Sequence, residues 1–81
     1  MSDLRRAADV HRFLQDHMRA GGLTELDPVT ANAILARAGV LRDSNSRPGK
    51  PLRDLLRAGL IPGAYQVPNK PNGRWHIPLL R

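Results

Sequence analysis

The spacing of apolar residues changes once along this chain of 81 residues, and that change limits the fold more than any other feature. As far as Leu60, apolar residues recur at intervals of three and four, which is typical of helices that pack on a core. After Ile61-Pro62-Gly63 they recur at every second residue, which is typical of strands. The sequence therefore predicts a mainly α domain with a C-terminal β-hairpin, in the α+β class.

The first expected helix runs from Asp3 to about Ala20 and ends at Gly21-Gly22, where glycine can supply a left-handed residue. Its apolar stripe predicts which side faces the core. The stripe consists of Leu4, Ala7 or Ala8, His11, Leu14 and Met18, widened by Val10 and Phe13. Charges of both signs alternate on the other side, as on a solvated surface. Residues 1–22 are therefore interpreted as a bracing helix.

Residues 28–60 are expected to form a helix-turn-helix. Asp27 is a good N-cap, Pro28 suits the first helical position, and Gly39 can end the second helix. That helix should bury Ala31, Ile34, Leu35 and Ala38. A polar loop follows, and the third helix is expected to begin at Pro51, close to Lys50, and to end at Gly59. It should bury Leu52, Leu55, Leu56 and Leu60 and point Lys50, Arg53 and Arg57 outward.

Residues 63–78 are expected to form the hairpin, with "PNKPNG" (68–73) as its loop. Alternation in both strands predicts one face that covers the helices. That face should carry Tyr65, Val67, Trp75 and Ile77, with Trp75 closing the core.

The positive charge is unevenly distributed along the chain. Residues 1–27 hold four arginines against five acids, whereas residues 28–81 hold nine Lys and Arg against Asp43 and Asp54. An excess of one sign on part of a small fold favours a polyanionic partner.

Other functions find little support in the residues. The chain has no cysteine, its histidines lack metal-site spacing, and no hydroxyl group has a plausible base partner, so no enzyme, metal site or cofactor is expected. No apolar run approaches the ~20 residues of a membrane span. We expect a cytoplasmic, nucleoid-associated protein.

Helix, turn, helix and hairpin, in that order, are typical of a winged helix-turn-helix, here with an extra N-terminal helix. The third helix would enter the major groove of double-stranded DNA, and the hairpin tip would approach the backbone or minor groove. The candidate DNA-binding residues are Arg42, Asn45, Arg47, Lys50, Arg53, Arg57, Lys70, Asn72 and Arg74.

The segments "LLRAGLIPGAYQ" and "NGRWHIP" resemble the closing portion of excisionase-like and MerR-like winged helix-turn-helix domains. The resemblance covers roughly residues 28–80 and departs from those domains in the longer turn between Val40 and Lys50. It implies a small phage or prokaryotic protein, either a transcription regulator or a recombination directionality factor. The sequence predicts no long dimerisation helix, so we expect a monomer, and the resemblance implies that it can line up on DNA as excisionase-like proteins do.

Two alternatives stay open at the level of sequence. A protein-interaction adaptor or antitoxin-like subunit could use the same basic surface to dock an acidic partner. The outward arginines could also form an ordinary solvated surface in which Arg53 or Arg57 pairs with Asp54 or with an acid of the first helix. Single-stranded or RNA binding is less favoured, because the chain has only three Phe, Trp and Tyr residues for stacking.

Overall fold

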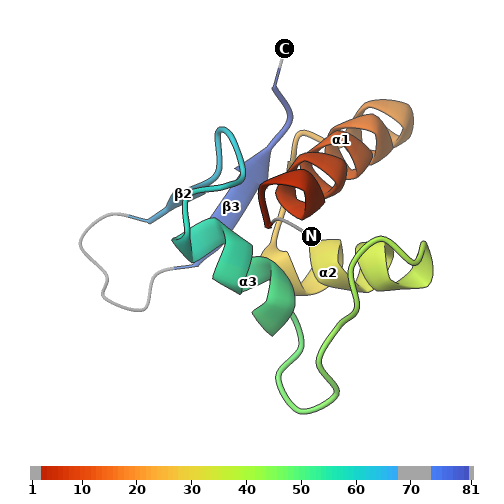
Figure 1. The fold of residues 1–81 in the computed structure, drawn as a ribbon. Coiled ribbons are helices and arrows are strands. Elements are labelled where there is room, and N and C mark those ends of the chain that lie inside the picture. Colours follow the sequence, from red (N-terminus) through yellow and green to blue (C-terminus); the bar gives the residue numbers. More distant parts are fainter. Residues whose placement is uncertain (1–2, 68–73, 81) are drawn as a thin grey trace.

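Three helices and a three-stranded antiparallel sheet make up the computed structural model, which describes residues 3–67 and 74–80 (Figure 1). The elements follow in the order α1 (Asp3–Gly21), β1 (Glu25–Leu26), α2 (Pro28–Arg37), α3 (Lys50–Arg57), β2 (Tyr65–Gln66) and β3 (Trp75–Pro78). This confirms the predicted α+β class. Strand β1 was not predicted, because two residues are too short to show an alternating pattern.

The helix boundaries lie close to the residues that the sequence marks. The Asp27 carboxylate accepts a hydrogen bond from the Thr30 N–H at 3.1 Å, which caps α2 as predicted. That contact is the main reason why the pKa of Asp27 lies below its usual value. Gly22 and Gly39 follow their helices in the left-handed conformation. Helix α3 begins at Lys50, one residue before the expected start at Pro51.

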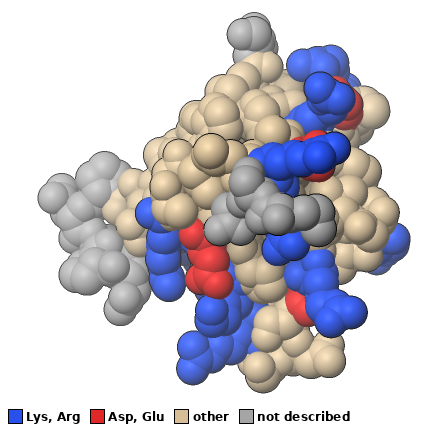
Figure 2. Space-filling model, in the orientation of Figure 1, with Lys and Arg blue, Asp and Glu red and all other residues tan. Residues whose placement is uncertain are grey.

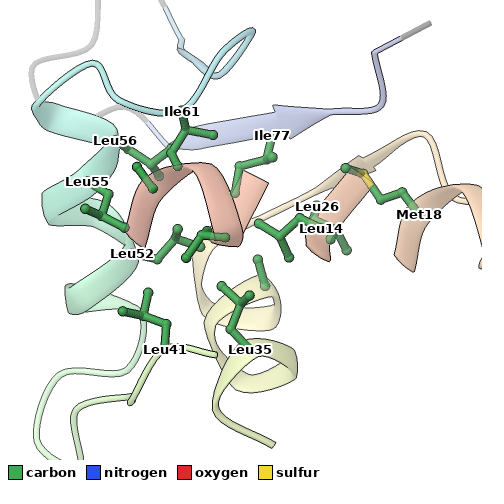
Figure 3. Close-up of a cluster of buried hydrophobic side chains, with 13 residues drawn as sticks. Leu14, Met18, Leu26, Leu35, Leu41, Leu52, Leu55, Leu56, Ile61 and Ile77 are labelled. Atoms are coloured by element: carbon green, nitrogen blue, oxygen red, sulfur yellow. The ribbon is translucent and has the colours of Figure 1, made fainter. Parts of the chain in front are cut away.

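One apolar core joins the helices to the sheet, and Figure 3 shows leucines of α2 and α3 gathered with Ile77 of β3. The predicted stripe on α1 needs correction at two positions. Leu4 is 67% exposed and His11 is only half-buried, so the buried side of α1 is a narrower row of small and aliphatic side chains. The row consists of Ala7, Val10, Leu14 and Met18. On α2, Ala38 is the exposed C-cap and not a buried residue.

The sheet has the strand order β1-β3-β2, and its register corrects the predicted hairpin face. Tyr65 lies opposite His76, and Gln66 lies opposite Trp75. Because residues directly opposite each other in an antiparallel pair share a face, Tyr65 lies on the side away from Trp75 and Ile77. Ile77 is fully buried and Trp75 packs partly buried against the core, whereas Tyr65 is 48% exposed. Val67, which alternation also predicted on the core side, is half-buried and does not belong to the core cluster.

On the outer face, side chains from all three strands contact one another. The Tyr65 hydroxyl donates to the Glu25 carboxylate at 2.7 Å, and the His76 Nδ1 lies 3.3 Å from the same group. The rings of Tyr65 and His76 stack with centroids 5.1 Å apart. The hydrogen bond to Glu25 raises the pKa of the Tyr65 hydroxyl above its usual value. These contacts explain why an aromatic residue is tolerated on the solvent side of β2.

Two buried amides connect the helices to other elements. On α1, the Gln15 Nε2 donates to the Pro78 carbonyl at 2.9 Å, and its Oε1 accepts from the Leu80 N–H at 2.8 Å. On α2, the Asn32 side chain has no exposed surface. Its Oδ1 accepts from the Leu52 N–H at 3.0 Å, and its Nδ2 donates to the Leu41 carbonyl at 3.4 Å. Asn32 therefore holds the start of α3 and the loop before it on α2.

We expect Asn32→Ala to lower the free energy of unfolding by about 2–4 kcal/mol, because truncation leaves a buried N–H and a buried carbonyl unpaired. This is a large part of the ~5–15 kcal/mol typical of a domain. Urea unfolding followed by circular dichroism measures the change. Asn45→Ala, in the exposed loop, is the control and should stay within ~0.5 kcal/mol. Equal effects of the two variants would contradict the role given to Asn32.

Candidate nucleic-acid interface

Helix α3 has one apolar and one cationic side. Leu52, Leu55 and Leu56 are buried against the rest of the protein. The opposite side carries a cationic surface, here named the α3 basic face, which consists of Lys50, Arg53 and Arg57. Figure 2 shows Lys and Arg atoms beside a small acidic patch where α3 lies in Figure 1. The helical period alone, as predicted, places these three cations on the side away from the core.

The backbone N–H groups at the start of α3 are all occupied. Lys50 donates to the Arg47 carbonyl, Arg53 donates to the Gly49 carbonyl, and Leu52 donates to Asn32. Pro51, the remaining residue of the first turn, has no N–H. An anion at this end of α3 would therefore be bound by side chains and not by free backbone donors.

The three side chains of the α3 basic face differ in how many hydrogen bonds and ion pairs they form within the protein. The Lys50 Nζ forms an ion pair with the Asp54 carboxylate at 2.9 Å, and both side chains are about half exposed. The Arg53 Nη2 donates to the Pro48 carbonyl at 3.3 Å. Arg57 has no hydrogen bond or ion pair within residues 3–67 and 74–80. The pairing that the sequence suggested for Arg53 or Arg57 with Asp54 is thus taken by Lys50.

The long loop between α2 and α3 folds around one carboxylate. The Asp43 Oδ1 accepts from the Ser44 N–H at 2.8 Å and from the Gly49 N–H at 2.9 Å. The Ser44 hydroxyl accepts from the Arg47 N–H at 3.1 Å. These bonds order the backbone of a segment without regular structure. The cationic side chains of this loop are therefore attached to a backbone in a defined conformation.

Gly49 packs directly on the backbone at the start of α2. It adopts the left-handed conformation with φ of +86°, and a Cβ at this position would lie 3.2 Å from the Val29 Cα. Glycine is therefore favoured both by its backbone conformation and by the close approach of α2.

The structure places the other predicted residues as follows. Arg42, Asn45 and Arg47 are exposed in the loop that leads into α3, so the chain brings them close in sequence to the α3 basic face. Arg74 is exposed immediately before β3. Lys70 and Asn72 lie outside the described residues, so the predicted position of the hairpin tip stays a prediction.

Arg6 of α1 was missed by sequence reasoning. It borders a hollow of ≈ 360 Å³ together with Lys50 and Asp54 of α3. It also borders a second hollow of ≈ 390 Å³ with Arg42. A signal was present: Arg5 and Arg6 lie in the first turn of α1, where the helix dipole disfavours cations. The basic surface around α3 therefore extends to the start of α1.

Two further properties hold for the described part of the chain. No group of three or more His, Asp and Glu side chains there is close enough to hold a metal ion. No helix there combines the length and apolarity that crossing a bilayer requires.

Comparison with known proteins gives no relative for this chain: no family model matches it, and neither a curated protein nor a solved structure matches significantly. The resemblance to winged helix-turn-helix domains stays a prediction.

The position of α3 should depend on glycine at residue 49. A left-handed non-glycine residue costs about 1–2 kcal/mol. We expect Gly59→Ala to show this cost alone, because an added Cβ there meets nothing within 4 Å. Gly49→Ala should cost at least ~1 kcal/mol more, because its Cβ also crowds the α2 backbone. Chemical denaturation of both variants measures the difference, and equal costs would show that the approach of α2 is not limiting.

Proposed function

We propose that this protein binds double-stranded DNA, with α3 in the major groove. The observation that carries the proposal is the α3 basic face: three cations opposite three buried leucines on a helix held at its start by a buried amide. Like charges three and four residues apart disfavour an isolated helix, so a polyanion would relieve a cost that the free protein bears.

The dimensions of α3 suit this role. An α-helix with its side chains is about 10–12 Å across, and the major groove is about 12 Å wide. The eight residues of α3 give an axis of about 12 Å, long enough to present side chains to a few base pairs. Arg57 is exposed in the last turn, and arginine can contact guanine or phosphate with two hydrogen bonds.

The exposed cations around α3 would contact phosphates. Arg42 and Arg47 lie on the loop that Asp43 orders, and Arg6 borders the same hollows as Lys50 and Arg42. Contacts to phosphates fix the register of a protein on DNA without reading its sequence. We also propose that Arg74, Lys70 and Asn72 belong to the wing of a winged helix-turn-helix. The protein would then act, without enzymatic activity, as a small transcription regulator or a recombination directionality factor.

Titration of fluorescent duplexes at several salt concentrations tests the proposal. The logarithm of the association constant should fall linearly with the logarithm of salt concentration, with a slope near −0.9 for each phosphate contact. With four to six such contacts we expect a slope of about −3.5 to −5.5. No duplex binding, or a slope near zero, would reject DNA as the partner. Retention of a partner protein after nuclease treatment would then favour the adaptor alternative.

Arg57→Ala should weaken duplex binding about tenfold at moderate salt, because this exposed arginine is available for a base or a phosphate. Stability should change by at most ~0.5 kcal/mol, since the side chain is exposed. Fluorescence anisotropy measures the affinity. Arg19→Ala is the matched control, because it also removes one exposed arginine from the last turn of a helix, but from α1. Equal losses in both variants would mean that only net charge matters.

A further inference from the structure

Asp54 is the one carboxylate on α3, and it lies on the proposed DNA-binding surface. It follows Lys50 by four residues and precedes Arg57 by three, so the helical period puts all three side chains on neighbouring parts of one side. Its side chain is 50% exposed. A negative charge at this place repels every phosphate that the surrounding cations attract.

Helix stability gives a weak reason for this acid. Its ion pair with Lys50 is exposed, and exposed pairs contribute little to folding. The cation also precedes the acid along the helix, which is the less favourable order for a pair four residues apart. Lys50 moreover occupies the first helical position, where the dipole disfavours a cation.

The chemistry of the carboxylate restricts what it can contact in DNA. The hydrogen bond from Lys50, with the charges of Lys50, Arg57 and Arg53, keeps the pKa of Asp54 below its usual value. The ionised group is therefore only a hydrogen-bond acceptor at neutral pH. Phosphate oxygens offer it no donor. In the major groove, cytosine offers its N4 amino group and adenine its N6 amino group, and acidic side chains pair best with cytosine N4.

We infer that Asp54 discriminates between base pairs by accepting a hydrogen bond from the amino group of a cytosine in the major groove. This inference rests on the proposed function. Lys50 also takes part: in the free protein its ammonium group pairs with the carboxylate. On DNA that ammonium group can turn to a phosphate or to the guanine of the same base pair. Sequence preference would thus come from repulsion as well as attraction, because a site without the amino group leaves the acid unpaired.

Selection from a random pool of duplexes, with wild-type protein, identifies the preferred site first. The affinities of wild type, Asp54→Asn and Asp54→Ala are then measured on four duplexes that differ at one base pair. For wild type we expect about tenfold preference for C·G at one position of the site. Asp54→Ala should lose that preference to within about twofold and bind unrelated duplexes more tightly, because a charge that repels phosphate is gone.

Asp16→Asn is the control, because Asp16 is also an exposed acid in an ion pair within one helix, with Arg19 of α1. It changes the net charge by the same amount as Asp54→Asn, so it should strengthen binding slightly and keep the C·G preference. A wild-type protein that prefers no C·G pair overturns the inference. The inference is also overturned if the Asp54 variants change the affinity for all four duplexes by the same factor. Failure of the wild-type protein to bind any duplex would instead reject the proposed function itself.

Discussion

The hydrogen bond from the Leu52 N–H to the Asn32 side chain holds the start of α3 on α2. Gly49 at the N-cap has no side chain, so α3 lacks the local capping group that most helices use. Asn32 supplies that group from α2, and its amide nitrogen also binds the Leu41 carbonyl at the start of the loop. A short helix that is marginal on its own is thereby fixed to its neighbour at the end that carries Lys50.

Gln15 connects α1 to the end of the sheet in a similar way, since its side chain binds the backbone of Pro78 and Leu80. In both cases a buried amide uses its donor and its acceptor on backbone groups outside its own helix. Such groups are costly to bury unless both partners are present, so each amide favours one arrangement of the elements over its near alternatives. The apolar core, in contrast, is made of aliphatic side chains that could pack in several related ways.

The sequence predicted elements whose signals are local. Asp27-Pro28, Gly39 and the leucines of α3 each mark a boundary or a buried side within a few residues, and the structure confirms them. The sequence could not show the register of β2 on β3. Register depends on which residue of one strand lies opposite which residue of the other, and alternation within each strand does not specify that pairing. The observed pairing differs from the expected one by a single residue: Tyr65 lies opposite His76 and not opposite Trp75, which puts Tyr65 on the outer face. Strand β1 and the position of Arg6 beside Lys50 depend on contacts between distant segments. The candidate cations of α3 were predictable because one helical period fixes their side.

The register of β2 and β3 has a consequence for how this hairpin can vary. Val67 donates to the Arg74 carbonyl, and six residues lie between them. Strand β3 is also paired with β1, so its pairing on both sides, and not the length of that connection, fixes which side chains of Trp75–Pro78 face the core. Among relatives with the same core, this connection should therefore differ in length by single residues without any change in the buried face of β3.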